Sequence, residues 1–174
     1  LPEMVNESIY ELAKTIKETL EHQGQMIATA ESCTGGMIAS SFVDIPGSSA
    51  ILAGGIVAYQ NEIKEKLLDV SAETIKKFGV VSAQTVKEMA QGARKKFGCE
   101  WAIATSGIAG PGGAEPGKPV GTVWIAVASS LQNEAFCEIF EGSRNKVREK
   151  SVYRAMQLLL SSINRQKSTC TNEH

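Results

Sequence analysis

The sequence is poor in the residues on which most hydrolases and metalloenzymes depend. Its 174 residues include two histidines, His22 and His174, and two aspartates, Asp44 and Asp69. His22 lies near the predicted end of the first helix and His174 at the last position, so we expect both to be solvated rather than catalytic. A Ser–His–Asp triad, a Cys–His pair or a histidine-rich metal site is therefore hard to assemble from this chain.

The cysteines show no metal or disulfide pattern. Four are present (Cys33, Cys99, Cys137 and Cys170), and no two form a CxxC pair. Because zinc sites and disulfide frameworks use closely spaced cysteines, we expect neither.

Long apolar runs and a strong charge imbalance are also missing. No stretch of about 18 apolar residues occurs, and residues 1–20 mix acidic and basic side chains in an amphipathic pattern unlike a signal peptide. The net charge of −1 gives no electrostatic reason to expect nucleic acid or an anionic membrane as a partner. We therefore expect a cytoplasmic protein.

The composition that is present is typical of one globular domain. Hydrophobic residues make up 43% and charged residues 21% of the 174 positions, which is enough for one well-buried core. We predict a single domain over residues 5–165, followed by a frayed tail at 166–174.

Apolar periodicity predicts helices and strands that alternate along the chain. We expect helices over 6–22, 35–43, 61–68, 72–78, 82–96 and 143–163, and strands over 26–30, 51–59, 101–105, 120–128 and 135–140. Gly54 and Gly55 indicate a bulge or a close backbone approach within the second strand. The predicted fold is a layered α/β/α domain with a mixed, mostly parallel sheet, because the last two strands look like a hairpin.

Two glycine-rich turns, at 31–36 and 105–113, each follow a buried strand. Ligands of α/β sheets bind beyond the carboxyl ends of strands, and a helix N-terminus suits an anion. Neither turn is a P-loop or a GxGxxG motif, so they indicate only a small anionic ligand. A capped turn and an exposed structural loop remain the alternatives, and Arg144 and Arg148 either face a phosphate or are solvated.

A nucleophile in this chain needs a base other than histidine. A lysine can serve when burial or neighbouring positive charge lowers its pKa, and a tyrosine hydroxyl can relay the proton. Ser48, Ser49, Tyr59 and Lys64 lie within one short segment. Their spacing alone also fits a capping serine, a partly buried tyrosine and a solvated lysine.

Six motifs occur in an order that resembles the C-terminal domain of the CinA competence/damage-inducible family, the PncC-type nicotinamide-nucleotide amidohydrolase. They are AESCTGG at 30–36, PGSS at 46–49, YQNEIK at 59–64, VS at 81–82, TSGIAGPGG at 105–113 and KPVGTVW at 118–124. The likeness spans roughly residues 5–163 and corresponds to the stand-alone form of the domain. It implies hydrolysis of the carboxamide of nicotinamide mononucleotide to nicotinic acid mononucleotide and ammonia, with no metal and no cofactor.

The resemblance also implies a site. Ser49 would be the nucleophile with Lys64 and Tyr59 as its catalytic partners, and Ser48 would be the fallback. Which turn holds the phosphate stays open. The residues expected to bind substrate are Ser32, Cys33, Thr34, Gly35, Gly36, Ser48, Ser106, Gly107, Ile108, Ala109, Gly110 and Arg144.

Two other functions remain possible at this point. One is a regulatory module that binds pyridine nucleotides without turnover, and the other is an amidase that uses Cys33, whose pKa a helix dipole can lower. In each case the partner is a small-molecule nucleotide, with no nucleic acid and no membrane, and a homo-oligomer is left open.

Overall fold

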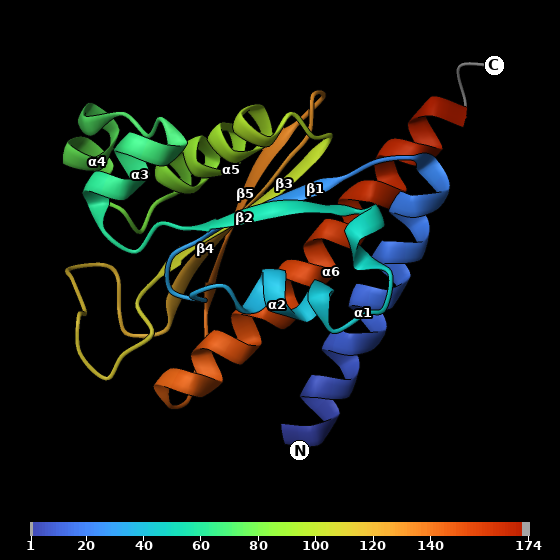
Figure 1. Cartoon of the computed structure of the whole chain (residues 1–174). Helices are drawn as coiled ribbons and strands as arrows, with labels where there is room; N and C mark the ends of the chain where they lie inside the picture. Colours follow the sequence, from blue (N-terminus) through green and yellow to red (C-terminus); the bar gives the residue numbers. More distant parts are fainter. Residues whose placement is uncertain (1, 172–174) are drawn as a thin grey trace.

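One five-stranded sheet separates two layers of helices (Figure 1). The computed structural model describes the backbone of residues 2–171 and the side chains of residues 9–169. In chain order the elements are α1 (Pro2–Gln23), β1 (Ile27–Glu31), α2 (Met37–Val43), the 3-10 turn η1 (Ser48–Ala50), β2 (Leu52–Val57), α3 (Asn61–Leu68), α4 (Ala72–Phe78), α5 (Ala83–Phe97), β3 (Trp101–Gly107), β4 (Thr122–Ala128), β5 (Asn133–Ile139) and α6 (Arg144–Thr171). No helix among these is long and apolar enough to cross a membrane.

The strands lie in the order β2-β1-β3-β4-β5. β1 is parallel to both β2 and β3, whereas β3–β4 and β4–β5 are antiparallel. The α/β class and the mixed sheet are confirmed, but the sheet is only partly parallel rather than mostly so. The reason is that no helix connects β3 to β4, so β4 returns antiparallel and continues into the predicted hairpin with β5.

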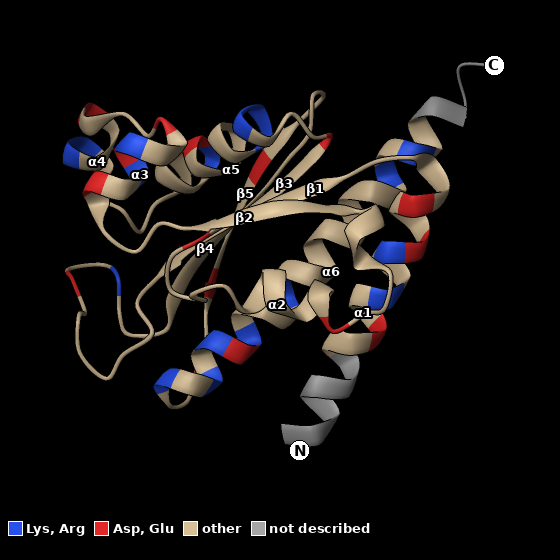
Figure 2. Ribbon diagram, viewed as in Figure 1, with Lys and Arg blue, Asp and Glu red and all other residues tan. Residues whose placement is uncertain are grey.

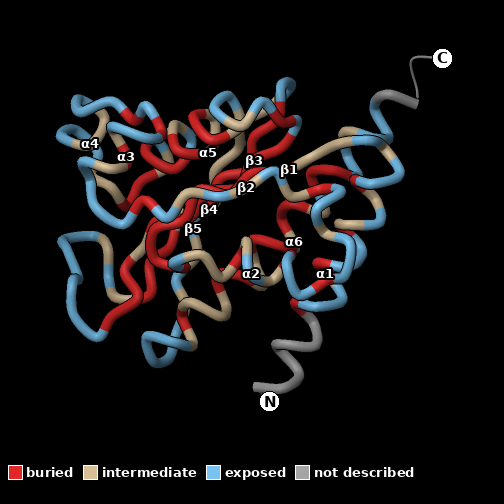
Figure 3. The backbone as a smooth tube through the Cα atoms, viewed as in Figure 1, coloured by how far each residue is buried: buried red, intermediate tan, exposed pale blue. Residues whose placement is uncertain are grey.

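The two faces of the sheet carry side chains of different size. On β3, Trp101 and Ile103 join the core beneath α1, α2 and α6, while Ala102 and Ala104 face the core beneath α3 and α5. Buried backbone accordingly follows the central strands (Figure 3). The alanine face allows α5 to lie close to the sheet, and α5 in turn supports α3.

Caps support three of the predicted helix ends. Ser71 accepts a hydrogen bond from the Glu73 N–H at the start of α4, and Ser82 accepts one from Thr85 at the start of α5. Gly98 ends α5 with φ 62°, in the left-handed region where glycine is favoured.

The last helix differs from expectation in length. α6 continues to Thr171, so residues 166–171 are helical where a frayed tail was predicted. The Ser129 hydroxyl donates to the Gln166 side chain at 2.8 Å and ties this part of α6 to the β4–β5 turn. Residues 172–174 lie outside the described part of the chain.

The predicted irregularity in the second strand is confirmed. β2 covers Leu52–Val57, and the β1–β2 register shifts between Ile27 and Ala28, which leaves Ala53 as an extra residue. A Cβ at Gly55 would lie 2.2 Å from Thr29 Oγ1, so the close approach requires glycine.

Candidate active site

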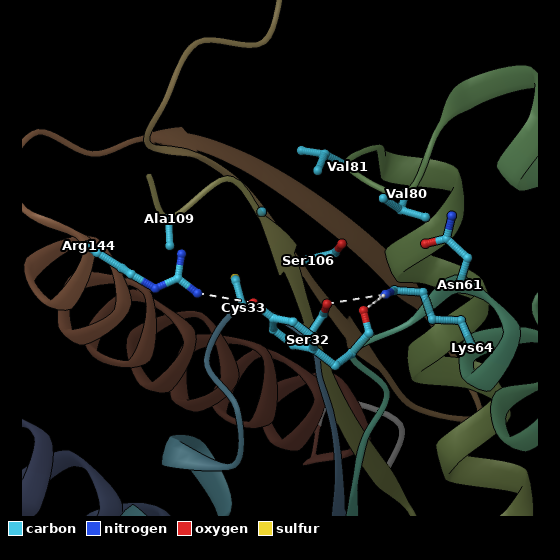
Figure 4. Close-up of a pocket in the computed structure, with 11 residues that line it drawn as sticks. Ser32, Cys33, Asn61, Lys64, Val80, Val81, Ser106, Ala109 and Arg144 are labelled. Atoms are coloured by element: carbon cyan, nitrogen blue, oxygen red, sulfur yellow. Dashed lines mark hydrogen bonds between the residues drawn. The ribbon is translucent and has the colours of Figure 1, made fainter. Parts of the chain in front are cut away.

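A pocket of about 180 Å³ lies at the carboxyl ends of β1, β2 and β3 (Figure 4). This is the edge where α/β sheets bind ligands. Its walls come from the turn after β1, the β2–α3 connection, the α4–α5 connection, the end of β3 and the start of α6. The lining residues are Ser32, Cys33, Tyr59, Asn61, Lys64, Val80, Val81, Ser106, Gly107, Ala109 and Arg144.

Lys64 and Ser32 form the polar centre of this pocket. Ser32 directly follows β1, Lys64 lies on α3, and they are 8% and 1% exposed. The Lys64 Nζ donates to Ser32 Oγ and to the main-chain carbonyl of Tyr59, each at 3.2 Å. Nζ forms no ion pair with any described carboxylate.

Burial lowers the pKa of Lys64 below its ordinary value of 10.5. A neutral amine is therefore accessible closer to physiological pH than it is for a solvated lysine. Because this amine already contacts Ser32 Oγ, it is placed to take the serine proton.

Ser49 lies elsewhere. It is exposed on η1, which precedes β2, whereas Lys64 follows β2. β2 has six residues, which at 3.3 Å per residue spans about 20 Å. The structure therefore brings neither Ser49 nor Ser48 to Lys64, because a strand separates segments that are close in sequence.

The Tyr59 side chain also differs from its expected position. Tyr59 is 60% exposed, and its hydroxyl accepts a hydrogen bond from Arg144 Nη2 at 3.0 Å. Arg144 Nη1 donates to the Gly110 carbonyl at 2.8 Å. The phenol thus orients Arg144 at the pocket mouth and is bonded there rather than between Ser32 and Lys64.

The rest of the AESCTGG motif builds the turn that holds Ser32. The buried Glu31 carboxylate accepts hydrogen bonds from the N–H groups of Ile38 and Ala39, at 2.9 and 3.1 Å, and from the Thr34 hydroxyl at 2.6 Å. Thr34 Oγ1 lies 2.7 Å from Thr105 Oγ1. Since the Thr34 proton is directed to Glu31, Thr105 is the donor of that second bond.

This network changes the expected phosphate position. The N-terminus of α2 is already occupied by the Glu31 carboxylate, and Thr34, Gly35 and Gly36 are not among the pocket-lining residues. Gly35 and Gly36 have φ of 58° and 99°, so the turn itself requires these glycines. The structure assigns these three residues to the turn and not to the pocket.

The second glycine-rich turn contributes only in part. Ser106, Gly107 and Ala109 line the pocket, as expected. Ile108 instead pairs its N–H with the Thr122 carbonyl at 2.8 Å, and Gly110 contributes the carbonyl that holds Arg144.

Three of the residues that line the pocket were not predicted from the sequence: Asn61, Val80 and Val81. Asn61 is the first residue of α3, and the two valines connect α4 to α5. Asn61 and Val81 lie within the motifs that carry the family resemblance, and their place in these motifs could have identified them as site residues.

Cys33 is unsuited to the nucleophile role. It is 7% exposed, and burial raises the pKa of its thiol to about 11. The reactive thiolate is therefore scarce near neutral pH. Among the described side chains, no group of three or more His, Cys, Asp or Glu residues could hold a metal ion.

Comparison with known proteins identifies the family. Residues 9–163 match the family model described as the CinA C-terminal domain. The chain belongs to this family. A CinA-like protein of Fervidobacterium nodosum is 45% identical over 168 residues, which is 94% of this chain and 41% of that protein. The chain spans about two fifths of the length of the curated relatives it matches.

Solved CinA-family structures share the fold over nearly their whole length. The competence/damage inducible protein CihA from Agrobacterium tumefaciens is 39% identical with a TM-score of 0.86, covering 90% of this chain and 96% of that one. A CinA superfamily protein from Klebsiella pneumoniae is 36% identical with a TM-score of 0.87, covering 90% and 98%.

Proposed function

We propose that this CinA domain hydrolyses the carboxamide of nicotinamide mononucleotide to nicotinic acid mononucleotide and ammonia, with Ser32 as nucleophile and Lys64 as general base. The observation that carries the proposal is the hydrogen bond between Lys64 Nζ and Ser32 Oγ inside the pocket. The family resemblance supplies the substrate class, and the geometry supplies the residues.

The reaction follows from this pair. Neutral Lys64 takes the Ser32 proton as Oγ attacks the carboxamide carbon, and the resulting ammonium then protonates the departing nitrogen. Ammonia leaves an acyl ester on Ser32. Water attacks that ester with Lys64 again as the base, which releases the carboxylate product and restores the serine.

The start of α6 supports an anionic substrate. Four of the first seven residues of α6 are cationic and one is acidic (Figure 2). Positive charge at a helix N-terminus is unfavourable for the helix, so a bound anion would relieve this repulsion. Arg144 is the one of these cations that lines the pocket. We assign the 5′-phosphate to Arg144, which the Tyr59 hydroxyl and the Gly110 carbonyl hold in place.

Ser106 supports recognition of a carboxamide. It is 2% exposed and lines the pocket, and its hydroxyl has no hydrogen-bond partner among the described residues (Figure 4). A hydroxyl can both donate and accept, which matches the amide group of the substrate.

Ammonia release from nicotinamide mononucleotide by the purified chain tests the proposal. Ser32→Ala should lower kcat by at least about 10³-fold, because removing a nucleophile leaves only binding and electrostatic contributions. Ser49→Ala is the matched control and should retain activity. An inactive Ser49→Ala beside an active Ser32→Ala would restore the nucleophile predicted from the sequence, whereas tight binding without ammonia release would indicate a regulatory module.

A further inference from the structure

The charges of the pocket suit a ligand that carries two anionic groups. Lys64 and Arg144 are the two cationic residues among the described residues that line it, and these include no aspartate or glutamate. Figure 4 shows the two cations at opposite sides, with Ser32 and Ser106 between them. The proposed substrate has its phosphate at Arg144, but its carboxamide is neutral. Lys64 therefore has no anionic partner while the substrate is bound.

Hydrogen-bond donors remain available at the Lys64 side of the pocket. An ammonium group has three N–H donors, and Lys64 uses two of them for Ser32 Oγ and the Tyr59 carbonyl, each at 3.2 Å. The Ser106 hydroxyl lines the same pocket and has no partner among the described residues. Lys64 and Ser106 thus offer one donor each, which matches a carboxylate, because its two oxygens can only accept.

The proposed hydrolysis produces a carboxylate beside Lys64. The attacking water gives one proton to Lys64, which passes it on to Ser32 Oγ, and keeps the other proton on the new carboxylic acid. A carboxyl group with an ordinary pKa of about 4 is a stronger acid than a lysine ammonium, so the second proton passes to the Lys64 amine. The product complex then contains a carboxylate beside an ammonium, with the phosphate still at Arg144.

Pairing with this ammonium is favourable because folding has already removed it from water. Lys64 is 1% exposed and forms no ion pair with any carboxylate in the described part of the chain. Binding of the product therefore desolvates the carboxylate alone, whereas a new buried ion pair usually desolvates both partners. Hydrogen bonds between charged groups are also roughly twice as strong as those between neutral groups.

The other titratable groups around Lys64 leave it available for this carboxylate. Burial raises the pKa of the Cys33 thiol to about 11, so the thiol is neutral near pH 7. The Glu31 carboxylate is bonded to the start of α2, and Arg144 is bonded to the Tyr59 hydroxyl. The buried residues of α5, which packs against α3, include no titratable group. The charged neighbours on α3 itself form no ion pair with Lys64, and they are Glu62, Glu65 and Lys66.

We propose that Lys64 and Ser106 bind the carboxylate of nicotinic acid mononucleotide more tightly than the carboxamide of the substrate, so that the product inhibits the enzyme. This inference rests on the proposed hydrolysis, which supplies the carboxylate. Only the ammonium form of Lys64 pairs with it, so the affinity for the product falls as pH rises through the pKa of Lys64, and binding above that pKa takes up a proton. Turnover has the opposite pH dependence, because the neutral amine is the base.

The test measures the binding of two nucleotides to Ser32→Ala, which lacks the nucleophile and so does not consume the amide. Calorimetry from about pH 6 to about pH 10 gives the Kd of nicotinic acid mononucleotide and of nicotinamide mononucleotide. Buffers of different ionisation enthalpy report the protons taken up on binding. Lys64→Met is then added to Ser32→Ala. Lys66→Met is the matched control, because Lys66 is exposed on the same helix and does not line the pocket.

We expect the acid to bind Ser32→Ala at least about tenfold more tightly than the amide near pH 6, the lower end of the gain from a hydrogen bond to a charged group. This preference should decrease with pH, and binding of the acid should take up protons whereas binding of the amide does not. Adding Lys64→Met should abolish the preference and the proton uptake, and adding Lys66→Met should retain both. In the wild-type chain, the Ki of the acid should increase with pH.

Equal affinities for acid and amide throughout the pH range overturn this inference, and so does a preference for the acid that persists after Lys64→Met is added. Either result leaves the proposed function standing. If the Lys64→Met variant does not fold, proton uptake by Ser32→Ala decides alone, and its absence overturns the inference. Absence of ammonia release by the wild-type chain overturns the proposed function instead. Since the affinities are measured without turnover, the two failures are distinguishable.

Discussion

At the scale of single residues, the burial of Lys64 has opposite effects on chemistry and on stability. Burial disfavours the ammonium form, which makes the amine a better base at neutral pH. The same burial means that folding near neutral pH must desolvate a charged group that has no carboxylate partner among the described residues. Lys64 is therefore expected to be essential for turnover and unfavourable for the folded state.

Lys64→Met should show both effects. We expect turnover to fall by about 10²–10⁴-fold, the usual contribution of a general base, while the midpoint of urea unfolding at pH 7 rises. The pKa of Lys64 is lower in the folded chain than its ordinary value of 10.5, so between the two values the unfolded chain binds more protons. Wild-type stability therefore rises with pH across that window, and the stability advantage of the Lys64→Met variant should disappear above it.

The wild-type pH profile supplies the second measurement. Because Lys64 must be neutral to act, kcat/KM should increase with pH to a plateau. The midpoint of this increase should give an apparent pKa below 10.5. A less stable Lys64→Met at pH 7, or a profile with its midpoint at the ordinary lysine value, would contradict this account.

The sequence named Lys64 as a candidate base and paired it with Ser49, whereas the proposed pair is Lys64 with Ser32. Ser49, Tyr59 and Lys64 were implied by the family resemblance, and the scarcity of histidine agreed with a lysine as the base. Ser32 lies 32 residues away in sequence, but it follows β1 as Lys64 follows β2. The parallel pairing of those strands brings their ends together, and neither composition nor spacing reveals which strands are neighbours.

At the scale of elements, the position of α3 depends on a glycine in α5. A Cβ at Gly92 would lie 1.8 Å from the Leu68 carbonyl oxygen, at the end of α3. A clash with a backbone atom at that distance cannot be relieved by a change of side-chain rotamer. Gly92 therefore permits the close packing of α5 against the helix that carries Lys64.

Gly92→Ala should destabilise the protein by about 1–3 kcal/mol in urea unfolding and lower turnover, since α3 must move away from α5. Helix propensity alone predicts the opposite sign, because alanine is favoured over glycine by about 1 kcal/mol inside a helix. Gly112→Ala is the control, as nothing lies within 4 Å of its added Cβ. Equal stability of the two variants would show that α3 and α5 are not closely coupled.

Elements governed by local chemistry were predicted well. Ser82 caps the helix that it was expected to begin, Ser71 caps the helix predicted over 72–78, and Gly79 and Gly98 follow the ends of these helices. The features that differ depend on tertiary contacts. The extension of α6 involves the bond between Ser129 and Gln166, and the direction of β4 depends on how the chain returns after β3.

At the scale of the whole molecule, the pocket joins parts of the chain that belong to different layers. Lys64 and Asn61 come from α3 on one face of the sheet, and Arg144 comes from α6 on the other (Figure 1). Ser32 and Ser106 come from the ends of the central strands between them. A ligand that contacts all of these segments should stabilise the whole fold.

The last prediction measures that coupling with a variant that binds without turnover. In Ser32→Ala, nicotinamide mononucleotide at about 100 times its Kd should stabilise the fold by about 2.7 kcal/mol, which corresponds to a rise in Tm of about 5–10 °C. Nicotinamide riboside at the same concentration should give a smaller rise, because hydrogen bonds to a charged group contribute about 1.5–3 kcal/mol each. Adding Arg144→Met to Ser32→Ala should make the rises in Tm for nucleotide and riboside similar. Adding Arg154→Met to Ser32→Ala should leave these two rises in Tm different, because Arg154 lies on the same helix but does not line the pocket. Equal rises for nucleotide and riboside before Arg144 is changed would place the phosphate outside the pocket and contradict its assignment to this arginine.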